Sequence, residues 1–303
     1  MPYRSRCTPR AKSTARPTRK AAAKLGGGFL AAVTALVTVG ALGAGSAAAA
    51  APSSTPQPGV SVTHLPAEVH PRGAARVTAA VLPLDGANRK VTVFGDDHAY
   101  DTASIVKVDI LAAVLLQAQG AGRTATAQER AYAQPMIQHS DNAAANTLWR
   151  QIGRAPGLDS ANKRLGLTGT KGGPGNKWGL TRTTASDQIR LLAAVFGSGG
   201  TPATASGVLA KESRAYVQTL MSSVERGQSW GISAAGGSSW AVKNGWLQRD
   251  ATGLWDINSI GLFTVNGHRC LMAVLSDRST SMSEGVKLVE SVARATARSA
   301  LAN

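Results

Sequence analysis

The pattern of hydrophobic and polar positions in residues 76–81 and 90–94, which are rich in Val and Thr, is typical of two β-strands. Between them lies 85–88, whose sequence Asp-Gly-Ala-Asn favours a turn. We therefore expect a β-hairpin here, followed directly by a helix.

The same pattern returns towards the end of the chain. Residues 239–246, 254–265 and 270–275 are strand-like, and Asn266-Gly267 separates the last two. Asn-Gly between apolar runs is a strong signal for a two-residue hairpin turn. We therefore expect a strand at 239–246, followed by an antiparallel hairpin formed by 254–265 and 270–275.

Apolar residues recur every three or four positions between and after the strand regions, which predicts amphipathic helices. Ser281 and Glu284 form a capping-box pattern before the last of them. The first expected helix begins near Ser104. Further helices are expected at 127–138, 185–196, 211–221 and 285–301, while 150–180 is expected to be loop and short helix.

This order of strands, helices, strands and helix predicts an α/β (α+β) fold. The first and last strands join one antiparallel sheet flanked by helices. A helical subdomain of about residues 121–211 is inserted between them, and the sheet and the subdomain are expected to form a cleft.

The first 51 residues have the composition of a secretory signal peptide. Eight basic residues and no acidic residue precede an apolar segment that ends in the small-residue tract Ala47–Ala51. Residues 52–75 are rich in Pro, Ser and Gly and are expected to be a flexible linker before a domain at 76–303. We expect a secreted, extracytoplasmic protein; an uncleaved membrane anchor is the alternative.

The formal charge of +16 falls to +8 without residues 1–51, because eight of the 33 basic residues lie there. No basic stripe interleaved with aromatic residues remains, so nucleic acid is not expected as a partner. Cys270 is the only cysteine after the leader, in an apolar run that predicts a buried thiol. The five histidines are scattered, so neither a metal nor another cofactor is expected.

Ser104 and Lys107 are three residues apart at the start of the first expected helix, which places both side chains on one face. A lysine packed against apolar residues loses hydration, and this favours its neutral amine. A neutral amine beside a hydroxyl is a base beside a nucleophile. The alternative is a helix-capping serine followed by a solvated lysine.

Two further motifs follow in order, Ser140-Asp141-Asn142 and Lys243-Asn244-Gly245. Together with Ser104-x-x-Lys107 they resemble the signature of the penicillin-recognising serine enzymes, the class A β-lactamases and DD-peptidases. The resemblance covers about residues 76–303. It implies the β-lactamase/transpeptidase fold and an acyl-enzyme mechanism.

The resemblance also implies catalytic roles for the matching residues. Ser104 is the nucleophile, Lys107 its base, and Ser140 relays a proton to the leaving nitrogen. The backbone N–H groups of Ser104 and Trp246 form the oxyanion hole. His139 is expected to pack rather than to take part in the chemistry.

Substrate binding is implied for four more positions. Asn142 binds the amide side chain of the substrate. Lys243 attracts its carboxylate and keeps Lys107 neutral by repulsion. Asn244 and Gly245 complete the third motif, although Asn244 stands where the family has a hydroxyl, and an amide cannot relay a proton in the same way.

A second departure concerns deacylation. Class A β-lactamases use a glutamate between the second and third motifs, but no glutamate lies between Glu129 and Glu212 here. Asp159 and Asp187 are the only acidic residues in that interval after Asp141, and neither is expected to replace the glutamate. If the enzyme turns over, Lys107 or a water that it polarises is expected to serve both steps.

The expected function is therefore an exported serine hydrolase that a β-lactam or a related amide or ester acylates on Ser104. A DD-carboxypeptidase or esterase is one alternative, and a non-turnover sensor that binds cell-wall peptide or β-lactam is another. The expected partners are small molecules, either a β-lactam or a cell-wall peptide, and the protein is expected to be a monomer.

Overall fold

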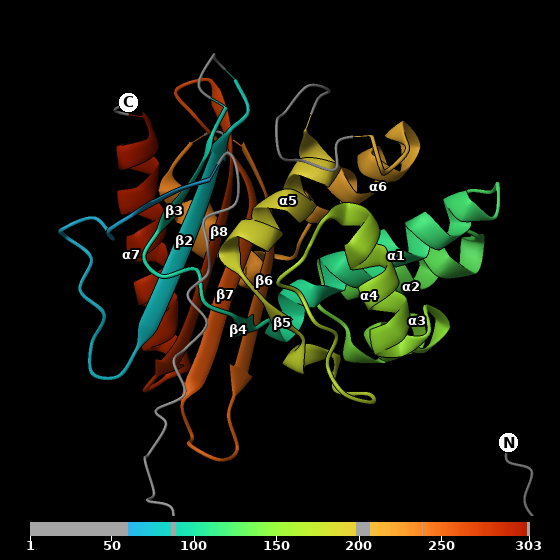
Figure 1. The fold of residues 1–303 in the computed structure, drawn as a ribbon, viewed down its shortest axis with the longest axis horizontal. Helices are drawn as coiled ribbons and strands as arrows, with labels where there is room; N and C mark the ends of the chain where they lie inside the picture. Colours follow the sequence, from blue (N-terminus) through green and yellow to red (C-terminus); the bar gives the residue numbers. More distant parts are fainter. Residues whose placement is uncertain (1–59, 86–88, 198–206, 238, 302–303) are drawn as a thin grey trace, which may run out of the picture. The chain divides into compact units, whose positions relative to one another are not determined.

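The computed structural model describes residues 60–85, 89–197, 207–237 and 239–301. The predicted signal peptide and residues 52–59 of the predicted linker lie outside these residues, as does most of the turn expected at 85–88. In the described part of the chain, the core is a β-sheet with helices on both faces (Figure 1).

The main sheet of the described residues has six strands in the order β1-β3-β2-β8-β7-β6. All neighbouring strands are antiparallel except β1 and β3, which are parallel. The strands are β1 Val60–Thr63, β2 Arg76–Pro83, β3 Val91–Phe94, β6 Ser239–Gln248, β7 Trp255–Val265 and β8 His268–Ser279. The first and last predicted strands thus join one sheet, as expected.

Both faces of this sheet are buried, since alternate residues of β2 enter two different cores. Ala79 and Val81 pack in the core that contains α7 (Met282–Leu301). Ala80 and Leu82 pack in the core that contains α5 (Ala185–Phe196). The two-residue period of a strand produces this division.

The remaining helices lie beside the α5 face (Figure 1). They are α1 Val106–Gly120, α2 Ala127–Gln138, α3 Asn142–Gln151, α4 Arg154–Leu165 and α6 Lys211–Met221. The structure differs from the predicted subdomain in two details. Helix α5 packs on the sheet. Residues 150–180 contain the twelve-residue helix α4, which the sequence pattern did not indicate because Pro156 and Gly157 are poor helix formers.

The predicted linker is shorter than 52–75. Strand β1 pairs with β3 from Val60 onwards, Val69 is 6% exposed, and Leu65 packs against the α7 core. Residues 60–75 therefore belong to the domain. Strand pairing and the burial of Leu65 and Val69 attach this segment to the domain, and composition alone does not detect these contacts.

Local signals at the end of the chain are confirmed. Asn266 and Gly267 both have positive φ, 51° and 79°, as a type I′ hairpin turn requires. The Glu284 backbone N–H donates to Ser281 Oγ at 3.1 Å at the start of α7. Cys270 is a buried free thiol, and burial raises its pKa to about 11.

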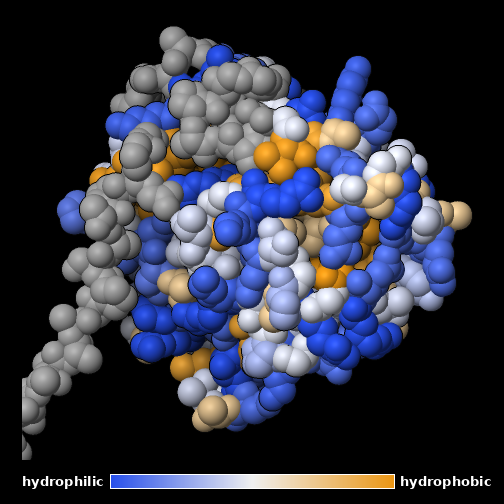
Figure 2. All heavy atoms as spheres, turned by 45° about the vertical axis from the view of Figure 1, so that its right-hand side comes forward, coloured by the Kyte–Doolittle hydropathy of each residue, from blue (hydrophilic) through white to orange (hydrophobic). Residues whose placement is uncertain are grey.

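Ala103–Gly120 is long and apolar enough to cross a membrane, but 78% of it is buried inside the domain, as in the core helix of a globular protein. Val62 is the only large hydrophobic residue in the described ranges that is exposed. Figure 2 shows one face, on which hydrophobic side chains appear in patches among hydrophilic ones.

Candidate active site

A cavity of about 780 Å³ lies between the edge strand β6 and the helical side of the molecule. Ser104 and Ser140 line it, together with Asn142 and Trp246. Residues of the first two sequence motifs therefore line one cavity, and Trp246, which follows the third motif directly, lines it from the edge strand.

Ser104 lies in a short 3-10 helix, η1 (Ala103–Ile105), directly before α1. The preceding residue, Ala103, has a φ of 48°, a conformation that costs a non-glycine residue about 1–3 kcal/mol. Asn258 of β7 holds this turn from below by donating to the carbonyls of Asp101 and Thr102 at 2.9 and 3.0 Å. The nucleophile thus sits on a strained turn that is anchored to the sheet.

Gly245 allows β6 to approach this turn closely. A Cβ atom added to Gly245 would lie 2.7 Å from Ser104 N, 2.8 Å from Ile105 N and 2.8 Å from Thr102 O. All three contacts are with backbone atoms, which cannot rotate away. Gly245 is required here for its lack of a side chain, a packing reason that the motif alone did not reveal.

Gly245→Ala is therefore expected to lower the free energy of unfolding by about 1–3 kcal/mol and to slow acylation of Ser104. Urea unfolding and the rate of covalent labelling measure the two effects. Gly120→Ala is the matched control, because nothing lies within 4 Å of the added Cβ. Equal stability and labelling of the two variants would contradict the close approach of β6 to Ser104.

Lys107 is fully buried and held by the second motif. Its Nζ donates to the Ser140 carbonyl oxygen and, at 2.8 Å, to Asn142 Oδ1. The Trp178 ring covers it, with the ring centre 4.8 Å from Nζ. Among the described residues, the Ser104 hydroxyl has no hydrogen-bond partner, so the structure connects Lys107 to Ser140 rather than to Ser104.

Ser140 Oγ lies between two lysine amines. It is 2.9 Å from Lys107 Nζ and 3.1 Å from Lys243 Nζ. Lys243 Nζ also contacts the Asn244 carbonyl oxygen at 2.8 Å and Gln228 Oε1 at 3.4 Å. Ser140 itself has a φ of 55°, so it is a second strained residue at the site.

Ser140 Oγ accepts a hydrogen bond from each of the two lysines. The Asn244 carbonyl and Gln228 Oε1 can only accept, so Lys243 Nζ donates to them as well. Lys107 Nζ likewise donates to the Ser140 carbonyl oxygen and to Asn142 Oδ1. Ser140 Oγ is therefore the atom that links the two amines.

Burial lowers the pKa of Lys107 to about 7, against the opposing effect of the Asp141 carboxylate. Burial and the charge of Lys107 lower the pKa of Lys243 well below its usual value. The charge of Lys107 is one cause of the lowered pKa of Lys243, whereas Lys243 is not among the causes that act on the pKa of Lys107. The repulsion from Lys243 that is implied for Lys107 by the family resemblance remains a prediction.

Lys243 and Asn244 do not line the cavity. Lys243 is 1% exposed beneath Ser140, and Asn244 is fully buried. The Asn244 side-chain amide donates to the carbonyls of Gln228 and Trp230, both at 2.9 Å. Their positions give no support to the predicted direct contact with a substrate carboxylate, because both side chains bind neighbouring protein groups.

Asn142 is exposed at the cavity and also accepts from Lys107. Trp246 lines the same cavity from the edge strand, and its ring is 6.2 Å from that of Trp230. The Ser104 N–H is at the start of a helical turn, where N–H groups have no intrahelical partner. The oxyanion hole at Ser104 and Trp246 remains a prediction.

Sequence reasoning missed a histidine–carboxylate pair in the cavity lining. His139 Nδ1 lies 3.2 Å from Glu225 Oε2, and their side chains are 58% and 46% exposed. His139 is thus not a packing residue. Gln228 Nε2 donates to Glu225 Oε1 at 2.9 Å, so Gln228 connects this pair to Lys243.

Asp159 and Asp187 hold backbone outside the cavity. Asp159 Oδ1 accepts from Gly172 N at 2.9 Å. Buried Asp187 accepts from Gly169 N and Thr170 Oγ1 and pairs with Arg190. These contacts agree with the expectation that neither aspartate replaces the missing glutamate.

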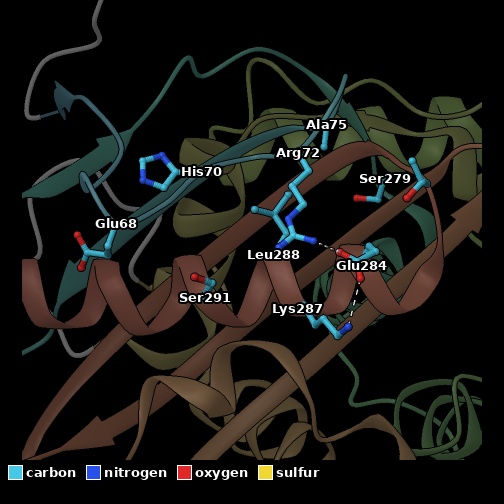
Figure 3. Close-up of a pocket in the computed structure, with 10 residues that line it drawn as sticks. Glu68, His70, Arg72, Ala75, Ser279, Glu284, Lys287, Leu288 and Ser291 are labelled. Carbon is cyan, nitrogen blue, oxygen red and sulfur yellow. Dashed lines mark hydrogen bonds and ion pairs between the residues drawn. The ribbon is translucent and has the colours of Figure 1, made fainter.

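A second cavity, of about 470 Å³, lies along α7 (Figure 3). Three of its charged residues pair with one another, Glu284 with Lys287 at 3.1 Å and with Arg72 at 3.9 Å. No lysine there is buried beside a hydroxyl. The described residues also contain no cluster of three His, Cys, Asp or Glu side chains able to hold a metal ion.

Comparison with known sequences points to one family. A sequence model described as "Beta-lactamase enzyme family" matches residues 122–300, which include the second and third motifs. The chain is also 31% identical over 138 residues to the "Putative lipoprotein LppW" of Mycobacterium tuberculosis and of Mycobacterium bovis. That match covers 45% of this chain and only 44% of those relatives.

Solved structures with the same fold include the TLA-1 extended-spectrum β-lactamase, with a TM-score of 0.63 and 17% identity. It matches 74% of this chain and 92% of that one. PBP-A has a TM-score of 0.62 and 20% identity, over 77% of this chain and 92% of its own. At these identities the comparison establishes the fold.

Proposed function

Because the chain belongs to the beta-lactamase enzyme family, within the superfamily of serine β-lactamases and penicillin-binding proteins, we propose that it is an extracytoplasmic serine hydrolase acylated on Ser104. The substrate class is a β-lactam or a related amide or ester, such as a cell-wall peptide. One observation supports this proposal: Ser104 and Ser140 line one cavity, and Ser140 contacts a buried lysine whose pKa is lowered to about 7.

In the proposed reaction, neutral Lys107 takes the proton of Ser104 as Oγ bonds to the substrate carbonyl carbon. The carbon–nitrogen bond then breaks. Ser140 gives its proton to the leaving nitrogen and receives one from Lys107, which Ser140 Oγ contacts at 2.9 Å. The backbone N–H groups of Ser104 and Trp246 stabilise the oxyanion. Lys107 ends the step neutral, as it began.

The titles of related structures supply a precedent for this chemistry. A variant of PBP-A is described as an acyl-enzyme complex with penicillin G. That protein shares 20% identity with this chain, so the precedent supports the choice of probe rather than the substrate of this protein.

Intact-mass spectrometry after incubation with benzylpenicillin tests the proposal. We expect either a persistent adduct of one penicillin per chain or free protein together with hydrolysed penicillin. A fluorophosphonate and a D-Ala-D-Ala peptide provide parallel probes for esterase and carboxypeptidase activity. Unchanged mass and no product with all three probes would exclude the proposed serine hydrolase.

The proposed extracytoplasmic location has its own prediction. The basic leader and the Ala47–Ala51 tract predict cleavage, so protein from the culture medium should begin within about five residues of Pro52. N-terminal sequencing measures this. Recovery only from membranes, with Met1 or Pro2 retained, would support the uncleaved anchor instead.

A further inference from the structure

The cavity that contains Ser104 also contains a preorganised pair outside the three motifs. His139 and Glu225 both line this cavity, with 3.2 Å between His139 Nδ1 and Glu225 Oε2. The Glu225 backbone N–H also donates to the carbonyl of Gln138 at 3.1 Å. The loop that carries the carboxylate is therefore fixed to the residue next to the histidine.

The carboxylate determines which nitrogen of the histidine carries the proton. Hydrogen bonds from Gln228 and from His139 lower the pKa of Glu225, so it is ionised and can only accept. His139 Nδ1 must therefore donate. In the neutral ring Nε2 is then an acceptor, and no described residue bonds it. This is the arrangement of a general base with its orienting carboxylate.

The other groups near the cavity are less suited to activate a water. Lys107 Nζ contacts the Ser140 carbonyl oxygen, Ser140 Oγ and Asn142 Oδ1, and in the proposed reaction it serves the acylation step. Both oxygens of Glu225 already accept hydrogen bonds. Asp159 and Asp187 bind backbone elsewhere.

We propose that His139, oriented by Glu225, is the general base that hydrolyses the Ser104 acyl-enzyme; this inference rests on the proposed function. A water attacks the ester carbonyl carbon while Nε2 takes its proton. As the carbon–Oγ bond of Ser104 breaks, the proton passes from Nε2 to Oγ. One ester and one water yield one carboxylic acid and the free serine. His139 thus replaces Lys107 as the base expected for this second step.

The pH dependence of deacylation follows from this assignment. The neutral ring is the base and protonation of Nε2 removes it, so the deacylation rate should rise with pH. Glu225 faces His139 directly, and the other charged or titratable groups around the cavity are Lys107, Asp141, Lys177, Lys243 and Asp250.

The experiment separates the two steps of the reaction. The protein is acylated with benzylpenicillin, excess reagent is removed, and loss of the adduct is followed by intact mass from pH 5.5 to pH 9. We expect His139→Gln to slow adduct loss by about 100-fold and to remove its rise with pH, while acylation changes less than about threefold. Glu225→Gln should slow adduct loss by about tenfold. His70→Gln, on the α7 cavity of Figure 3, is the matched control.

Added imidazole distinguishes a lost base from a damaged fold. In His139→Ala it should accelerate loss of the adduct, but it should not do so in the wild-type protein. Loss from His139→Gln at the wild-type rate, or an adduct that persists on the wild-type protein, would overturn this inference and leave acylation of Ser104 intact. No adduct and no hydrolysed product from the wild-type protein with any probe would overturn the proposed function and this inference together.

Discussion

Ser104→Ala is expected to abolish covalent labelling by benzylpenicillin and by a fluorophosphonate. The hydroxyl is the only atom of Ser104 that can bond to a carbonyl carbon, and alanine removes it without adding bulk. The strained turn at Ala103 and the bonds from Asn258 do not involve this hydroxyl, so the fold should survive.

Intact mass of the labelled protein and a thermal unfolding curve measure the two parts of this prediction. We expect no adduct on Ser104→Ala and a midpoint within about 2 °C of wild type. Ser291→Ala, on the second cavity, should label normally. If the Ser104 variant is labelled as fast as wild type, another residue is the nucleophile.

The fold was largely predictable because its signals are local. The pattern of hydrophobic and polar positions located the strands, and Asn266-Gly267 and Ser281 marked a turn and a helix start that the structure reproduces. The errors arose where tertiary contacts outweigh composition. Strand β1 is ordered by pairing with β3, and no property of residues 60–63 alone reveals that partner.

The sequence motifs located residues that lie near one another, but they did not predict the contacts of those residues. Ser104 and Ser140 line one cavity, and Lys107 contacts Ser140. The motifs could not show that Asn244 turns its amide towards the 228–230 backbone. The alternation of side chains along β6 places Asn244 on one face of the strand. Which backbone groups its amide meets there depends on the position of the loop at 228–230, and the motif carries no information about that loop.

The His139–Glu225 pair could not be found from the sequence, since 86 residues separate its members. The only sequence signal is a histidine directly before the second motif. A histidine in that position is equally compatible with packing, and only the fold shows that a carboxylate lies beside it.

Lys107→Arg is expected to reduce the acylation rate by about 10³-fold. Arginine keeps the positive charge but stays protonated at every accessible pH, so it cannot take the proton of Ser104. The substitution therefore distinguishes two roles of Lys107, that of a base and that of a positive charge that only binds the substrate. Acylation rates of the two proteins with benzylpenicillin at pH 8 measure the effect, and comparable rates would exclude Lys107 as the base.

The pH dependence of acylation tests the same assignment without a change at Lys107. The neutral amine is the reactive form and its pKa is lowered to about 7, so the wild-type rate should rise with pH through that value and then level off. Burial lowers that pKa and the Asp141 carboxylate opposes the shift, and the charge of Lys243 is not among its causes. Lys243→Met should therefore slow acylation but leave the midpoint of the rise within about 0.5 pH unit. A midpoint displaced further upward would mean that Lys243 carries charge and keeps Lys107 neutral by repulsion, as the family resemblance implied.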